Sequence, residues 1–171
     1  DKAEELRTLY VNEGASKQLL AQIDGIIKNP YYDGFFDPTT RKIVIITSRV
    51  NSLEQTESIV NHESVHATNR NFLGARRRDI LNFFHEQYGE QNALDYLSEG
   101  YSDLESFDMA DEVIAYKVQG MIDNKTIPTE KPLTYREIVD IVEGNAIIDN
   151  FTERLISTIY HETQTHRGTN G

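Results

Sequence analysis

Helical spacing of apolar residues, bounded by caps and chain breakers, is the feature that most limits the folds open to this chain. Isoleucine and leucine recur every three or four residues in most segments, and capping patterns such as Ser52 with Gln55 and Thr134 with Glu137 mark where helices begin. The sequence therefore predicts a protein built mainly of helices. The expected helices are residues 2–10, 15–28, 53–71, 76–88, 91–98, 106–121, a short one after Thr134, and 147–160.

One segment has the pattern of strands. Aromatic and β-branched residues at Tyr31–Phe36 and Lys42–Thr47 flank the turn formers Asp37–Thr40, which is typical of a β-hairpin. The second strand is apolar on both faces, so we expect helices to cover it on both sides. The predicted fold class is α+β: a mostly helical domain in which a small sheet or β-hairpin packs on the helix that follows.

The length and composition fit one compact domain. With 171 residues, 38% hydrophobic and 26% charged, the chain is expected to bury a core without disulfides or a partner chain. We expect residues 1–171 to form a single domain, with a loose polar tail at about 163–171. The chain starts at Asp1 without an apolar leader, which suggests a trimmed N-terminus. The compartment is left open, with the cytoplasm preferred and secretion as the alternative.

Charge and residue usage exclude several classes of function. Lysine and arginine number 17 against 28 acidic residues, and the net charge of −11 argues against nucleic acid as a partner in spite of the cluster Arg76–Arg78. The longest purely apolar run, Ile43–Ile46, is far shorter than the roughly 20 residues of a membrane span, so no membrane partner is expected. Without cysteine, thiol catalysis and Cys-based zinc fingers are excluded. The sequence carries no signal for the oligomeric state.

The pattern H-E-x-x-H occurs at His62-Glu63-Ser64-Val65-His66, in the middle of a predicted helix. Residues four positions apart on a helix differ by about 40° around its axis and lie one turn apart, so His62 and His66 point the same way. Their two imidazoles can therefore bind one metal ion. Glu63 is rotated by about 100° from His62 and about 60° from His66, which lets it reach a water on that ion without being a ligand.

A chance match on a polar helix face, with solvated or hydrogen-bonded histidines, is the alternative to a metal site. Chance gives this pattern in about one of a hundred chains with five histidines, before helical context is required. Imidazole nitrogens suit Zn²⁺, and an open catalytic site has three protein ligands plus a water. Asn69 and Phe72 stand where the extended pattern has its glycine and its third histidine. The third ligand should then be a carboxylate on a later helix.

Glu112 is the first candidate for that carboxylate. It lies among apolar residues of a helix that is expected to face the core, where a carboxylate is costly unless it is paired or binds metal. The alternative is an ordinary acidic residue in the first turns of a helix, where the macrodipole favours it. Asp108, one turn earlier, is expected to hold a ligand imidazole by a hydrogen bond. Other candidates for the third ligand are Glu105, Asp108 and Glu99.

The motif His62–His66, followed by Glu-x-x-Ala at Glu112–Ala115, resembles the zincin metallopeptidases of the gluzincin type, in particular their compact single-domain members. The stretch from Gly34 through the hairpin to the motif helix is also similar to zincin-like domains of phage and mobile-element polyvalent proteins. The resemblance covers about residues 31–120, and the Asn-Glu-x-x-Ser-Asp pattern of thermolysin-like relatives is not present. It implies Zn²⁺, hydrolysis of a protein or peptide substrate, the ligands His62, His66 and Glu112, Glu63 as the general base, and an edge strand such as Ile43–Thr47 that pairs with the extended substrate.

Peptide hydrolysis at such a site needs a base and an oxyanion donor. Zinc would bring the pKa of its water towards about 7, and Glu63 would move the proton of that water to the leaving amine. Tyr116, Tyr160 and His161 are candidate oxyanion donors. A zincin-fold protein-binding or regulatory module and a metal-dependent hydrolase of another substrate class are the alternative functions. Glu63 favours an enzyme, because a structural metal site has no need of a base.

Two further histidine patterns are not expected to bind metal. His161 and His166 lie five positions apart and diverge by about 140°, so we interpret them as part of a solvated tail. In the segment His85–Glu90, Gly89 should end the helix before Glu90 is presented beside His85. We interpret this second segment as ordinary polarity on a helix surface.

Overall fold

The computed structural model describes residues 2–28, 33–37, 40–144, 146 and 148–170. The chain forms two compact units, residues 1–63 and 64–171, and the division between them falls inside one continuous helix, α3 (Leu53–Leu73). The architecture is helical with a small antiparallel sheet, which confirms the predicted α+β class. The two units are described separately below, and the assignment of residues 1–171 to a single domain stays a prediction.

The first unit is built from two helices and the hairpin. Helix α1 (Lys2–Asn12) packs on α2 (Lys17–Lys28), and β1 (Gly34–Asp37) pairs with β2 (Lys42–Ile45) in an antiparallel two-stranded sheet. The register places Gly34 opposite Ile45 and Asp37 opposite Lys42. Apolar residues of α2 and of the hairpin segment form the core of this unit: Leu19, Ile23, Ile26, Phe35 and Ile46.

The hairpin packs directly on the first half of α3, as the sequence predicts. A Cβ atom placed on Gly34 would lie 2.7 Å from Cγ2 of Ile59 and 2.9 Å from the carbonyl oxygen of Val44. Both distances are shorter than carbon atoms tolerate, so only glycine fits between the helix and the neighbouring strand. The side-chain amide of Gln55 also donates to Asp33 over 2.9 Å. These contacts fix the hairpin to the helix that carries the motif.

Strand β2 differs from the prediction in its burial. Ile43, Val44 and Ile45 are all half-buried, so helices do not cover both faces of the strand. In a two-stranded sheet each strand is an edge strand. Of the apolar run, Val44 packs against the core of this unit and Ile46 belongs to it. The predicted strand residues 31 and 32 and the turn residues 38 and 39 lie outside the described part of the chain.

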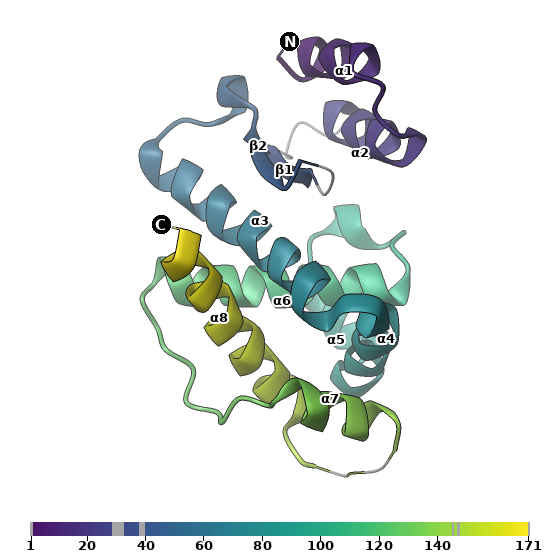
Figure 1. The fold of residues 1–171 in the computed structure, drawn as a ribbon, viewed down its shortest axis with the longest axis vertical. Coiled ribbons are helices and arrows are strands. Elements are labelled where there is room, and N and C mark those ends of the chain that lie inside the picture. The colour runs from purple at the N-terminus through teal and green to yellow at the C-terminus, as the bar shows by residue number, and fades with distance from the viewer. Residues whose placement is uncertain (1, 29–32, 38–39, 145, 147, 171) are drawn as a thin grey trace. The chain divides into compact units, whose positions relative to one another are not determined.

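The second unit is a helical bundle (Figure 1). After the second half of α3 it contains α4 (Arg77–Tyr88), α5 (Glu90–Tyr96), α6 (Ser106–Asp123), α7 (Tyr135–Val142) and α8 (Phe151–Asn170). Helix α6 packs against α4, α5 and α8, and it is almost completely buried along its inner face. The core consists of large aliphatic and aromatic side chains from four helices, among them Ile80, Leu81, Phe84, Val113, Ile114, Ile138, Leu155 and Ile159. No helix in the described residues is both long and apolar enough to cross a membrane.

Capping explains where two of these helices begin. The backbone N–H of Gln55 donates to Oγ of Ser52 over 3.0 Å at the start of α3. Thr134 and Glu137 form the predicted reciprocal capping box at the start of α7, with both hydrogen bonds at 3.1 Å. Such caps satisfy backbone N–H groups that have no partner within the helix.

The last helix extends further than predicted. Helix α8 continues to Asn170, so the backbone from residue 163 is helical where we expected a loose tail. Thr163 is completely buried, and its hydroxyl donates to the hydroxyl of Thr68 on α3 over 3.0 Å. The polar composition after Tyr160 hides this contact, because threonine hydroxyls can be buried once they are hydrogen-bonded.

Candidate metal centre

Helix α3 positions the two histidines of the motif. His62 and His66 lie one turn apart on this single helix, and both are half-buried. The neighbouring Val65 and Thr68 are buried, which anchors the helix on either side of His66. The predicted helical context of the motif is therefore confirmed.

Helix α6 brings the predicted carboxylate to these histidines. One ligand atom from each of His62, His66 and Glu112 lies within 4.8 Å of the other two. Within the described residues, this is the only group of three or more such side chains that could hold one metal ion. Glu105, which precedes the first residue of α6 and is exposed, and Asp108 are not part of the group. The side chain of Glu99 lies outside the described part of the structure.

The imidazole of His66 lies between two consecutive carboxylates of α6. Its Nδ1 is 3.0 Å from Oδ2 of Asp111, and its Nε2 is 2.8 Å from Oε1 of Glu112. Consecutive residues on a helix diverge by about 100°, so one carboxylate reaches each edge of the ring. With Nδ1 held by Asp111, Nε2 is the nitrogen directed at the point where the three side chains converge.

Asp111 takes the role that we predicted for Asp108, so that prediction is wrong. Oδ1 of Asp111 accepts from Nδ2 of Asn69, which is completely buried, and Arg77 Nη1 lies 3.8 Å from Oδ2. Asp108 forms no hydrogen bond to either imidazole within the described residues. The signal available in the sequence was spacing: Asp111 directly precedes Glu112, and Asn69 lies three positions after His66, on the same side of α3.

The surroundings of His66 strongly alter its protonation. Burial disfavours the imidazolium, but the neighbouring Asp111 and Glu112 outweigh burial and hold the pKa of His66 well above its ordinary value. Burial also raises the pKa of Asp108, with a further contribution from the nearby Asp111. The two neighbouring acidic side chains therefore favour the protonated form of this imidazole in the metal-free centre.

The residues present fit a zinc ion. Two imidazole nitrogens and one carboxylate oxygen form the donor set of many catalytic zinc sites, and nitrogen donors favour zinc over magnesium or calcium. Their ligand atoms lie within 4.8 Å of one another, whereas atoms that bind one ion at about 2 Å each lie at most about 4 Å apart. The carboxylate that orients His66 is also a regular feature of metal-binding histidines. The side chains of His66 and Glu112 are only 16% and 18% exposed, which limits the number of waters around a bound ion.

Glu63 follows His62 on α3 and is half-buried. Its position on the helix is the one that the motif requires for a base beside the ligands, because it points about 60° to one side of His66 and about 100° from His62. Its role as the base stays a prediction.

The candidate oxyanion donors have different surroundings. Tyr116 lies one turn after Glu112 on the same side of α6, and its hydroxyl is 2.5 Å from that of Tyr101, with the two rings edge to face. Tyr160 is buried, and its hydroxyl accepts from Gln164 over 3.4 Å. His161 is exposed on α8. The position of Tyr116 on the helix of Glu112 makes it the strongest of the three candidates.

The segment around His85 differs from its interpretation as surface polarity. Helix α4 ends at Tyr88, as predicted, but His85 is only 7% exposed. Gly89 then adopts a positive φ of 97°, which turns the chain so that Glu90 lines the same groove as His85 and Glu86. The interpretation as surface polarity is therefore wrong for His85, whereas the end of α4 before Glu90 agrees with the prediction. The side chain of His166 lies outside the described part of the structure.

A scan against protein-family models and searches of curated proteins and solved structures found no match to this chain. The resemblance to zincins therefore depends on the motif and on the arrangement of its side chains.

Proposed function

We propose that this protein is a zinc-dependent hydrolase of peptide bonds. One observation carries the proposal: Glu112, distant in sequence from the H-E-x-x-H motif, lies with His62 and His66 in a group whose ligand atoms are within 4.8 Å of one another. A chance motif on a polar helix has no reason to meet a carboxylate in this way. The hydrogen bond from His66 to Asp111 adds support, because it orients the imidazole for metal binding.

The residues have separate tasks in this reaction. His62, His66 and Glu112 would hold the ion, which when bound acidifies a water and polarises the substrate carbonyl. Glu63 accepts one proton from the water while the oxygen of that water forms a bond to the carbonyl carbon. Glu63 then donates the proton to the amine nitrogen as the C–N bond breaks. Tyr116 donates its hydroxyl hydrogen bond to the developing oxyanion. Asp111 and Asn69 keep the imidazole of His66 in place.

The substrate class follows from charge and from the resemblance. The net charge of −11 favours substrates with basic segments through long-range attraction. An extended protein or peptide chain is the substrate that the motif and its carboxylate ligand suggest.

The test separates binding of zinc from turnover. Wild-type protein should contain one zinc per chain by elemental analysis and cleave members of a quenched-fluorescence peptide library. Glu63→Gln should retain zinc and lose activity by a factor of about 10² or more, because the base is removed without removing a ligand. His62→Ala should lose both zinc and activity.

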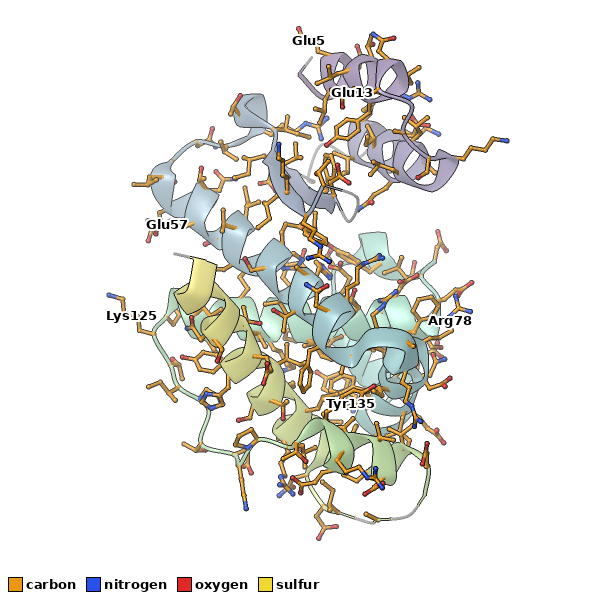
Figure 2. The ribbon with its side chains drawn as sticks, viewed as in Figure 1. Glu5, Glu13, Glu57, Arg78, Lys125 and Tyr135 are labelled. Carbon is orange, nitrogen blue, oxygen red and sulfur yellow. The ribbon has the colours of Figure 1, made fainter. Side chains whose placement is uncertain are left out.

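Glu57→Gln is the matched control for Glu63→Gln. Glu57 lies on the same helix, and its side chain is exposed at the outer edge of α3 (Figure 2). This variant should retain zinc and full activity. Zinc content that is unaffected by His62→Ala would overturn the metal site. Unchanged turnover in Glu63→Gln would overturn the role of Glu63 as the base and would favour a binding module.

A further inference from the structure

A second polar site lies in a groove of the helical bundle, apart from the proposed zinc ligands. The groove has a volume of about 400 Å³ and is lined by Asn82, His85 and Glu86 of α4, Glu90 of α5 and Ser106 of α6. None of these residues belongs to the group around His66. The side chains that line the groove are all of polar types and include two carboxylates, which favours a ligand that carries positive charge.

His85 is the unusual member of this lining. It is only 7% exposed, yet its Nδ1 is shielded from solvent and has no hydrogen-bond partner within the described residues. Buried polar atoms in proteins almost always have a partner, so an exception such as this one needs an explanation. A neutral imidazole with its proton on Nε2 offers Nδ1 as an acceptor, and in this tautomer the ring can take a hydrogen bond from a donor group of a ligand.

The carboxylates beside His85 also have no counter-charge. Glu86 and Glu90 are exposed, and neither forms an ion pair with a residue in the described part of the chain. Arg78 lies two turns before Glu86 on α4, but its guanidinium is 4.4 Å from the centre of the Phe107 ring and is thus engaged elsewhere. The groove therefore combines two negative charges with a histidine side chain whose shielded Nδ1 has no partner within the described residues.

The spacing of these groups distinguishes an organic cation from a metal ion. His85, Glu86 and Glu90 are side chains of metal-binding type, but their ligand atoms do not gather within 4.8 Å of one another as those of His62, His66 and Glu112 do. A bare ion needs all its ligands at about 2–2.6 Å. A guanidinium or ammonium group with several N–H donors can bridge more widely spaced acceptors.

We propose that this groove binds the basic side chain of a peptide or protein, with its guanidinium or ammonium group between Glu86 and Glu90 and an N–H donated to Nδ1 of His85. A rotation of the imidazole about χ2 presents this acceptor to the groove, and side-chain changes of this kind are common on binding. The hydroxyl of Ser106 and the side-chain oxygen of Asn82 supply further acceptors.

The experiment is a titration of the whole 15N-labelled chain with methylguanidinium, followed by NMR, with uncharged methylurea as the matched probe. Methylguanidinium should shift the signals of residues 82–90 and 106 in a saturable way, and methylurea should not. The double variant Glu86→Gln/Glu90→Gln should bind methylguanidinium at least about tenfold more weakly. The control double variant Glu54→Gln/Glu57→Gln changes two exposed carboxylates of α3 and should bind as the wild type does.

Two further arms complete the test. A short arginine-containing peptide should bind more tightly than free arginine, and replacement of its arginine by citrulline should abolish the shifts. Equal binding of the peptide and free arginine would identify a small-molecule cation site and overturn the peptide assignment. An equal response to methylurea, a response to Mg²⁺ in place of methylguanidinium, or unchanged binding in Glu86→Gln/Glu90→Gln would overturn the site itself. His85→Gln, checked for folding by circular dichroism, should also weaken binding.

Discussion

His66 and His85 are both largely buried on helices of the same protein, but they differ in their partners. The side chain of His66 is 16% exposed and has a carboxylate at each ring nitrogen, whereas His85 is 7% exposed and its Nδ1 accepts from no described donor. Burial alone therefore says little about what a histidine does. The partners distinguish a ring that can exchange a proton for a metal ion from one that can accept a donor from outside the chain.

The difference also separates two kinds of acidic surroundings. The carboxylates around His66 come from consecutive residues of one helix and converge on one ring. Beside His85, Glu86 lies on α4 and Glu90 follows the turn at Gly89, and their ligand atoms do not gather with that of His85. Convergence favours a small, doubly charged ion, and separation favours a larger cation with several donors. The predictions below test this contrast.

The largest effect is expected from replacing each histidine by phenylalanine in metal-free protein. His66→Phe should reduce the free energy of unfolding by about 3 kcal/mol, because it leaves Asp111 and Glu112 largely buried without the positive imidazolium between them. His85→Phe should change it by no more than about 1 kcal/mol, since no hydrogen bond of Nδ1 is lost. Urea denaturation in the presence of a chelator measures both. Equal losses in the two variants would break the comparison.

Replacement of the carboxylate at Nδ1 of His66 should have the next largest effect. Asp111→Asn should lower zinc affinity by about 10 to 100-fold, because the imidazole loses the partner that orients it and increases its basicity. Asp108→Asn removes a carboxylate from the same helix without touching either imidazole, and zinc affinity should be unchanged. Competition with a fluorescent chelator gives both values. A larger effect of Asp108→Asn would restore our first assignment.

The stability of the metal-free protein and its affinity for zinc should depend on pH with opposite signs. Because the pKa of His66 is raised in the folded protein, its stabilisation is fully present below about pH 6.5 and is lost as the pH rises through the folded value. Zinc needs the unprotonated Nε2, so its affinity should increase by up to about tenfold per pH unit over the same range. Calorimetry in buffers of different ionisation enthalpy measures the proton released. Zinc binding without proton release would contradict the imidazolium in the metal-free centre.

The smallest effect concerns a neutral pair on the helix of Glu112. Tyr101→Phe and Tyr116→Phe should each reduce stability modestly, with a coupling of about 1 kcal/mol in the double-mutant cycle, because their hydroxyls are hydrogen-bonded to each other. Urea denaturation of the two single variants and the double variant gives this value. Strict additivity would show that the pair contributes nothing as a pair, unlike the charged pairs of His66.

Much of the fold could be predicted because periodicity and caps are local signals. Helix α6 was expected at residues 106–121 and spans Ser106–Asp123, and Thr134 with Glu137 marked the start of α7 correctly. The course of α8 beyond Tyr160 could not be predicted, because the contact that keeps Thr163 buried is made with Thr68, far away in sequence. Local composition there indicates only polarity.

The candidate site shows the same limit. The motif fixes the direction of His62 and His66 because both lie on one helix, and the grouping of Glu112 with them agrees with the prediction of the third ligand. The choice between Asp108 and Asp111 depends on how α6 is rotated towards His66, and helical spacing does not give that rotation. The surface position predicted for His85 is wrong for a related reason: its burial depends on neighbouring helices, which the local pattern does not reveal.

The close approach at Gly34 makes the packing of the hairpin on α3 sensitive to a single substitution. A single methyl group at this position would collide with Ile59 and with the backbone at Val44, so Gly34→Ala would displace the hairpin from α3. Residue 34 thus offers a way to lift the strands from the first half of α3 by the smallest possible chemical change, while every side chain that lines the groove or surrounds His66 keeps its identity.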